Sequence, residues 1–330
     1  MNMHWNWGRI FQTMKKIGNM DPEVTWNVAR VIGGNYVGDQ YNAPIHIAVL
    51  DTGVDASHPD LAGRVSWSVD LTTNQGVTDN GHGTHVTGVI AADKNNQGIA
   101  GIYPNADIYS FKIIDSVTKE GEWSWLDTAI HMAVAGPDGV VGTADDANII
   151  NMSFGSGTEV PPTYIHEAIQ WAYNHDVVMV AAGGNDGDGS ASTNEINYPA
   201  AYPEVIAVSA LDFTNTVTDF SSSGSYIEMS APGDGILSTY LDNSYAIWGG
   251  TSMATPHVTG VVALIMAAYG HLPVGTMSDY GFGTIRGILH MMASDLGTAG
   301  WDPAYGWGMV QFNSGSTTTN AHGHGHGRGH

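Results

Sequence analysis

A short motif near the end of this chain carries the residue types of a nucleophilic serine centre. In GTSMATPHV (250–258), a glycine-led turn runs straight into apolar, Ala-rich sequence, which predicts a helix that starts at Ser252. The first N–H groups of a helix have no partner within it, and the helix dipole favours negative charge there. Ser252 is therefore a candidate to attack a carbonyl and help hold the resulting oxyanion. The alternative is that Ser252 only caps the helix.

Two upstream motifs supply the partners that a nucleophilic serine needs. Residues 45–50 are apolar and rich in β-branched side chains, so they predict a buried strand that ends at Asp51. The motif NGHGTHV (80–86) leads into a predicted helix with His82 near its start. A general base must be an imidazole that can be neutral and that a carboxylate orients. Asp51, His82 and Ser252 thus form a candidate triad, in one of the known chain orders.

Other residues in these motifs could compete for the same roles. Asp55 also lies in DTGVD, but Asp51 directly follows the strand, where α/β sheets place functional groups. His85 could share a metal ion with His82, yet no HExxH pattern or cysteine accompanies the pair. We interpret His85, like His58 and His257, as a packing residue.

A fourth segment offers a donor for the oxyanion. Residues 176–182 predict a strand that ends in the turn Gly183-Gly184-Asn185. The Asn185 amide could donate to the oxyanion beside the backbone N–H of Ser252. The alternative is that Asn185 only serves the turn.

The motifs DTGVD, NGHGTHV and GTSMATPHV resemble, in this order, the three active-site motifs of the subtilisin-like serine proteases (subtilases). The similarity extends from about Val24 to about Val310, although the family's Ala-Ala-Gly-Asn is here Ala-Gly-Gly-Asn. It implies a serine endopeptidase that acts on polypeptides, with four catalytic residues: Asp51, His82, Ser252 and Asn185. A non-catalytic peptide-binding module with the same fold is the alternative, and the presence of all four residues argues against it.

The resemblance also implies where a substrate binds. Residues 149–155 resemble the strand that pairs with the substrate backbone, and the second flanking segment includes Gly121 and Trp123. The peptide would then bind as an added strand between two edges. Trp123 would line a distant apolar pocket, unless it is only a core aromatic of the following helix. The pocket for the residue before the scissile bond would have these walls: Ser153, Phe154 and Gly155 on one side, Gly183 and Gly184 on the other.

These pocket walls carry no charge, and by the same alignment the floor lies near Asn197, which is polar but neutral. A buried carboxylate would instead favour basic side chains, as in trypsin. The resemblance therefore predicts broad cleavage that favours large apolar side chains before the scissile bond.

Calcium is the cofactor that the resemblance implies. Residues 93–99 are similar to a subtilisin calcium loop, and all-oxygen ligation suits Ca²⁺. Asp21 or Glu23 could add a ligand from the N-terminal side. The ligands expected at this first site are Asp60, Asp93, Asn95, Gln97 and Ile99.

A second calcium site is predicted in residues 137–146, which look inserted relative to the family. Its candidate ligands are Asp138, Asp145 and Asp146. The segment does not fit an EF-hand, because no Glu falls at the twelfth position. Acidic turns of this kind are alternatively only solvated.

A scaffold for these residues follows from the hydrophobic pattern. Strand-like runs (47–50, 107–113, 148–153, 177–182 and 205–210) alternate with helix-like runs (123–135, 162–175, 252–268 and 283–294). This alternation predicts an α/β fold: a doubly wound, mainly parallel sheet with helices on both faces. The chain divides into a basic N-terminal extension (1–20), a catalytic domain (21–312) and a low-complexity His/Gly tail (313–330).

Composition excludes some classes of partner. The net charge of the whole chain is −22. Residues 1–20 carry a charge of +3, so the remainder carries −25 (−22 minus +3). So acidic a chain is an unsuitable partner for nucleic acid. No apolar run reaches the length of a membrane span, and the absence of cysteine excludes disulfides. We expect a monomer. No signal peptide is visible, and the expected location is extracellular, with the cytoplasm as the alternative.

Overall fold

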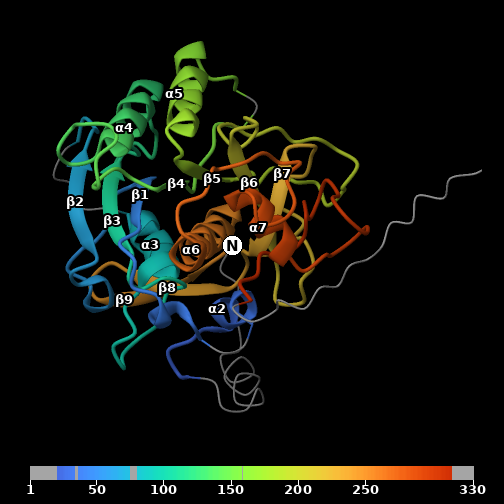
Figure 1. The fold of residues 1–330 in the computed structure, drawn as a ribbon, viewed down its shortest axis with the longest axis horizontal. Helices are drawn as coiled ribbons and strands as arrows, with labels where there is room; N and C mark the ends of the chain where they lie inside the picture. The colour runs from blue at the N-terminus through green and yellow to red at the C-terminus, as the bar shows by residue number, and fades with distance from the viewer. Residues whose placement is uncertain (1–20, 34–35, 75–79, 158, 314–330) are drawn as a thin grey trace, which may run out of the picture.

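A seven-stranded parallel sheet forms the centre of the molecule (Figure 1). The computed structural model describes residues 21–33, 36–74, 80–157 and 159–313. The strand order is β2-β3-β1-β4-β5-β6-β7, and a separate antiparallel hairpin pairs β8 with β9. The strands are β1 His46–Asp51, β2 Val65–Asp70, β3 Asp107–Lys112, β4 Ile149–Met152, β5 Val178–Ala182, β6 Val205–Leu211, β7 Ile227–Pro232, β8 Ile236–Tyr240 and β9 Ser244–Trp248.

Helices cover both faces of the sheet. One buried apolar cluster contains side chains of α2, α3, α6 and α7, and a second contains side chains of α4 and α5. Figure 1 shows these two groups on opposite sides of the strands. The helices are α2 Trp26–Val31, α3 His82–Ala91, α4 Trp123–Ala135, α5 Thr163–Asn174, α6 Thr251–Tyr269 and α7 Ile285–Met292, with short 3₁₀ turns η1 Gly38–Gln40 and η2 Pro59–Leu61. The predicted fold class is confirmed.

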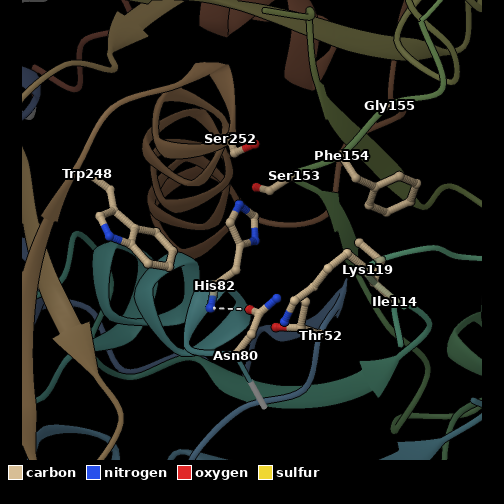
Figure 2. A pocket seen from close by; sticks show the side chains of 10 residues that line it. All are labelled: Thr52, Asn80, His82, Ile114, Lys119, Ser153, Phe154, Gly155, Trp248 and Ser252. Atoms are coloured by element: carbon tan, nitrogen blue, oxygen red, sulfur yellow. Dashed lines mark hydrogen bonds between the residues drawn. The ribbon is translucent and has the colours of Figure 1, made fainter. Parts of the chain in front are cut away.

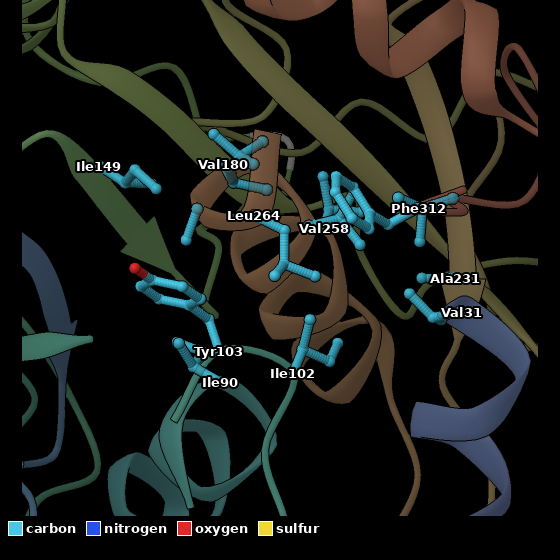
Figure 3. Packing of buried hydrophobic residues seen from close by; sticks show 14 of the residues in the cluster. Val31, Ile90, Ile102, Tyr103, Ile149, Val180, Ala231, Val258, Leu264 and Phe312 are labelled. Carbon is cyan, nitrogen blue, oxygen red and sulfur yellow. The ribbon is translucent and has the colours of Figure 1, made fainter. Parts of the chain in front are cut away.

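Helix α6 is the packing centre of one layer (Figure 3). Its residues from Met253 to Met266 are all buried, so it is apolar on every side rather than on one stripe. By length and composition α6 could cross a membrane, but 83% of the relevant window lies inside the protein. The fold therefore accounts for its hydrophobicity as a core helix.

The strand order reverses direction beside β1. After β1 the chain adds β2 and β3 on one side of it, then returns to place β4 on the other side. In open α/β sheets, functional groups gather at the carboxyl ends of strands where the order reverses. Asp51 ends β1 and Ser153 follows β4, so both lie at this position. The extension 1–20 and residues 314–330 of the tail lie outside the described residues.

Candidate active site

Asp51 and His82 are in direct contact. Asp51 is fully buried, and its Oδ1 accepts hydrogen bonds from His82 Nδ1 at 2.7 Å and from the backbone N–H of Thr52 at 2.8 Å. The His82 side chain is 22% exposed, so one end of the ring is fixed while the other reaches the pocket. A carboxylate in this position sets the tautomer and orientation of an imidazole.

The start of α3 places His82 by local backbone chemistry. Gly81 takes the N-cap position with φ +88°, which favours glycine, and Asn80 Oδ1 accepts from the backbone N–H of His82 at 3.0 Å (Figure 2). Gly83 then lets α3 approach β1, because a Cβ there would lie 2.2 Å from the carbonyl oxygen of Gly53. The helix can thus begin directly against the end of β1.

Ser252 is the second residue of α6, so its backbone N–H belongs to the first helical turn. Gly250 precedes the helix with φ +154°, a conformation that L side chains rarely adopt. Ser252 is half-buried and lines the same pocket as His82 (Figure 2). Pro256 lies inside α6, one turn beyond Ser252.

The pocket that holds His82 and Ser252 is an open cavity of about 520 Å³. Trp248 flanks it on one side, with its ring stacked on buried His85 at 5.1 Å and 5.9 Å from the ring of His82. Figure 2 shows Ile114 and Lys119 on the opposite side of His82. The lining residues are Thr52, Asn80, His82, Ile114, Lys119, Ser153, Phe154, Gly155, Trp248 and Ser252.

Asn185 lies next to the start of α6. Its side-chain Oδ1 accepts from the backbone N–H of Thr251 at 2.9 Å and from Thr251 Oγ1 at 3.1 Å. Because the amide oxygen is held in this way, the amide N–H groups point away from Thr251, and the residue is exposed. Asn185 therefore presents a donor beside Ser252.

The two predicted pocket walls approach each other across Asn197. A Cβ at Gly155 would lie 2.0 Å from Asn197 Nδ2, and one at Gly184 would lie 3.1 Å from Asn197 Cβ. Asn197 itself is buried, donating to the carbonyl oxygen of Ala182 at 2.9 Å and accepting from the N–H of Gly157 at 2.7 Å. Gly183 lies next to Gly184 at the end of β5 and is buried. The walls thus enclose a neutral, hydrogen-bonded side chain.

The second flanking segment lies at the edge of this pocket. Gly121 forms an antiparallel bridge with Ile114, which lines the pocket. Trp123 starts α4 and packs partly against the core cluster of α4 and α5. It is not one of the residues that line the pocket of His82 and Ser252, and its role in a more distant pocket stays a prediction.

The first predicted calcium loop wraps around Asp60. This residue is fully buried, and its Oδ2 accepts from the N–H of Ile99 at 3.0 Å and from Tyr245 Oη at 2.9 Å. The Asp60 carbonyl oxygen accepts from the N–H of Asp93 at 2.7 Å. Asn95 Oδ1 accepts from the N–H of Gln97 at 3.0 Å. The loop and Asp60 therefore form one connected unit.

Glu23 adds a second buried carboxylate to this region. Its Oε2 has no hydrogen-bond partner among the described residues, and its backbone oxygen accepts from the N–H of Ala100 at 2.9 Å. Burial, followed by the charge of Asp21, raises the pKa of Glu23, and Asp60 contributes in the same direction. An orphaned buried oxygen beside a like charge fits a bound cation. Within the described ranges, no cluster of three or more His, Asp, Glu or Cys side chains is arranged for a metal.

The second predicted calcium segment binds its own backbone. Asp145 Oδ2 accepts from the N–H of Asp138 at 3.0 Å, and Asp138 Oδ1 accepts from the N–H of Val140 at 2.7 Å. Asp146 Oδ2 accepts from the N–H of Gly142 at 2.6 Å. The three carboxylates are thus bonded to the backbone of their own turn, and the second calcium site stays a prediction.

Sequence reasoning missed two residues that shape the site. Thr251 fixes Asn185, and its only signal was its place between Gly250 and Ser252. Trp248 walls the pocket from the end of β9, a hairpin that the hydrophobic pattern did not reveal. Both contacts join segments far apart in the chain, so local sequence could not predict them.

Comparisons with known proteins identify the family of this chain. The family model described as "Subtilase family" matches residues 43–308. The chain is 41% identical to the Major intracellular serine protease of Bacillus subtilis (strain 168) over 227 residues, which is 67% of this chain and 68% of that protein. It is 40% identical to the Intracellular serine protease of Paenibacillus polymyxa over 227 residues, covering 67% of this chain and 66% of that protein.

Another relative is similar over a longer stretch. Identity to Subtilisin E of Bacillus subtilis (strain 168) is 38% over 267 residues, which is 81% of this chain. The aligned part spans 64% of Subtilisin E, slightly less than two thirds of its length. The family model matches most of this chain and the central sheet is parallel, so the chain belongs to the subtilase family of serine proteases.

Proposed function

We propose that this chain is a serine endopeptidase in which Ser252 is the nucleophile, His82 the general base and Asp51 the residue that orients His82. The observation that carries the proposal is the 2.7 Å contact between buried Asp51 and His82, whose ring faces the pocket that Ser252 lines. A serine hydroxyl is a weak nucleophile until a neutral imidazole removes its proton. This arrangement supplies that base at the start of a helix.

The reaction then follows from the positions of these groups. His82 takes the Ser252 proton as Oγ attacks the peptide carbonyl, and the resulting imidazolium gives that proton to the leaving amine. Water next attacks the acyl-enzyme, with His82 acting again as base, and releases the second product. Asp51 stays ionised and stabilises the imidazolium at each step.

Asn185 and the backbone N–H of Ser252 hold the oxyanion in this proposal. Support comes from the two hydrogen bonds that Thr251 donates to Asn185 Oδ1, since they leave the amide as a fixed donor. A donor that is already oriented costs no reorganisation when negative charge develops. Removing the corresponding donor costs about 3–4 kcal/mol of transition-state stabilisation, a value that comes from subtilisin itself.

The substrate residue before the scissile bond would enter the slot between Ser153–Gly155 and Gly183–Gly184. We propose broad cleavage that favours large apolar side chains, because Asn197 is neutral and both of its polar groups are already bonded. One methylene is worth only about 1–3 kcal/mol in such a pocket, so preferences should be graded. Profiling on a mixed peptide library tests this. Cleavage confined to sites after Lys or Arg, or after Asp or Glu, would contradict it.

Calcium would stabilise the fold from the loop around Asp60. We propose that the ligands are Asp60, Asn95 and the carbonyl oxygens of Asp93, Gln97 and Ile99, joined by Glu23. The unpartnered buried oxygen of Glu23 supports the fit, since a cation would neutralise it. A second ion near Asp138, Asp145 and Asp146 has weaker support, because none of these carboxylates has a buried oxygen without a hydrogen-bond partner, as Glu23 has at the first site.

Polypeptides are the proposed substrates, and we propose that the protein acts as a monomer. The predicted extracellular location and its cytoplasmic alternative each have a counterpart among the relatives, which include intracellular proteases and an extracellular one.

Replacing the nucleophile tests the proposed function. Ser252→Ala should lower kcat for casein and peptide hydrolysis by a factor on the order of 10⁶, the size of the effect in subtilisin itself. The circular dichroism spectrum should stay unchanged. The fold should persist because the hydroxyl is not an N-cap of α6; Gly250 holds that position.

A labelling experiment supplies the matched control. The pocket contains a second serine, Ser153, which is buried and accepts from Asn151 Nδ2 at 3.0 Å. A fluorophosphonate should label Ser252 in the wild type and in Ser153→Ala, and neither residue in Ser252→Ala. An adduct mapped to Ser153, or a folded Ser252→Ala protein that still cleaves peptides, would refute the assignment. A wild-type protein that binds peptides without cleaving them would favour the peptide-binding module.

A further inference from the structure

We infer that Lys119 is a specificity-determining residue that favours an acidic side chain at the second substrate residue before the scissile bond. The inference rests on the proposed function, because it assumes that a peptide lies across the pocket of His82 and Ser252. Lys119 lines that pocket beside Ile114, on the side of His82 away from Trp248 (Figure 2).

Lys119 differs in charge from the other residues that line the pocket. Among the described residues that line the pocket there is no other lysine or arginine, and no aspartate or glutamate. Lys119 therefore places a positive charge at the pocket of a chain whose net charge is −22. An acidic peptide would be repelled by the molecule as a whole, and Lys119 is the lining group that attracts it locally.

The ammonium group of Lys119 is available to a ligand. Its Nζ donates to the carbonyl oxygen of Ser116 at 2.5 Å, and an ammonium has two further donors. Among the described carboxylates, none forms an ion pair with it, whereas Lys94 pairs with Asp21 and Asp39. A carboxylate from a substrate would thus find an unneutralised partner.

The loop that presents Lys119 is well fixed. Asp115 Oδ1 accepts from the N–H groups of Val117 at 2.8 Å and Thr118 at 3.1 Å, while its Oδ2 accepts from Asn74 Nδ2 at 2.7 Å. The N–H of Lys119 then donates to the carbonyl oxygen of Asp115 at 2.9 Å, closing the turn. A charge held on a closed turn loses less conformational entropy when it binds than one on a free loop.

The position of the contact follows from strand geometry. Successive side chains of an extended peptide point to opposite sides. If the first residue before the scissile bond enters the slot between Ser153–Gly155 and Gly183–Gly184, the second points toward His82, Ile114 and Lys119. Ile114 can contact the methylenes of a glutamate there while Lys119 meets its carboxylate.

Three peptides that differ only at this second position, with Glu, Gln or Lys, test the inference. For the wild type we expect kcat/KM to be about twofold to fivefold higher for Glu than for Gln, the range of an exposed ion pair, and lowest for Lys. The preference for Glu should disappear in Lys119→Gln and reverse in Lys119→Glu. Added salt at 0.5 M should reduce it in the wild type, because exposed charges are screened.

Two controls separate this inference from the proposed function. Arg30→Gln removes the same unit of charge from α2, where Arg30 bonds to the carbonyl oxygen of Phe213, and it should keep the wild-type preference. Affinities of the three peptides for Ser252→Ala should follow the same order without any cleavage. An equal ratio in the wild type and in Lys119→Gln would overturn the role of Lys119. If the wild type cleaves none of the peptides, the endopeptidase proposal fails, and the binding order still decides the role of Lys119.

Discussion

Individual histidines show how burial fixes a protonation state in this protein. His257 in α6 is fully buried, with Nδ1 donating to the carbonyl oxygen of Met253 at 2.9 Å and Nε2 accepting from Asn27 Nδ2 at 2.8 Å. Both ring nitrogens are satisfied only in the neutral form, because a proton on Nε2 would face a donor. Burial lowers the pKa of His257 to about 4, and it lowers the pKa of His85 to about 4 as well.

The low pKa of His257 makes stability depend on pH. The unfolded chain binds a proton near pH 6.5, whereas the folded chain resists it down to about pH 4, so stability is lost as pH falls through this window. We expect His257 to remove about 2 kcal/mol from the free energy of unfolding between pH 7.5 and pH 5. Urea denaturation at both pH values measures the loss.

A pair of variants isolates the His257 effect. In His257→Gln the difference in unfolding free energy between the two pH values should shrink by about 2 kcal/mol. His131→Gln, which removes a histidine whose side chain is 47% exposed, should keep the wild-type difference. An unaltered pH dependence in His257→Gln would show that burial does not suppress protonation there.

At the scale of elements, the close approach of α3 to β1 governs the catalytic geometry. A methyl group at Gly83 would lie 2.2 Å from the carbonyl oxygen of Gly53 and 3.2 Å from Asp51 Cβ. Neither atom belongs to a flexible side-chain end, so the helix start itself would have to shift. His82 is the neighbouring residue and would move with it.

We therefore expect Gly83→Ala to reduce kcat by about 100-fold or more, since an error of about 1 Å in a catalytic group can have that effect. The loss should appear mainly in kcat, because the pocket walls belong to other segments. Gly283→Ala is a matched control for glycine removal, since Gly283 does not require a positive φ and nothing lies within 4 Å of a Cβ there. Normal turnover by Gly83→Ala would mean that α3 tolerates displacement.

The loop after α3 is the element on which calcium should act. If Ca²⁺ binds the folded chain only, a hundredfold excess over Kd adds about 2.7 kcal/mol to the free energy of unfolding. Thermal unfolding with and without a chelator should reveal this, and Glu23→Gln should reduce the difference by removing one negative ligand. A melting temperature that stays the same after the ion has demonstrably been removed would disprove a stabilising site.

The elements that sequence predicts best are those with continuous apolar patterns. The predicted runs match β1, β3, β4, β5 and β6 to within one or two residues, because these strands are buried on both faces. Strand β2 was missed since it is an edge strand, only partly buried. Strand β7 was missed because Glu228 interrupts its apolar run, and only its distant partners Arg286 and His290 make that charge tolerable in the core.

In the candidate site, too, local sequence patterns predict some residues, whereas others depend on tertiary contacts. The triad candidates were predictable because each lies at the end of a strand or the start of a helix with a glycine beside it. The contact of Thr251 with Asn185 and the stacking of Trp248 on His85 depend on tertiary packing, so no local pattern predicts them.

For the whole molecule, the dominant electrostatic feature is the net charge of −22. Like charges repel most in the compact state, and salt screens them over a length that falls from about 30 Å at 0.01 M to about 10 Å at 0.1 M. We expect the melting temperature to rise by a few degrees between 10 mM and 500 mM salt. Scans in NaCl and in KCl, both with a chelator present, measure this apart from calcium. A melting temperature that falls with salt would show that attractive pairs dominate.

The chain order of the site has a consequence for synthesis. Asp51 and His82 lie within the first 82 residues of the chain, whereas Ser252 belongs to helix α6 and follows His82 by 170 residues (252 minus 82). A nascent chain on the ribosome therefore contains the proposed base and its carboxylate long before it contains the proposed nucleophile. Proteolytic activity would then arise only when α6 has emerged and packed against the sheet and α3. Until then, the nascent chain would hydrolyse neither ribosomal proteins nor itself.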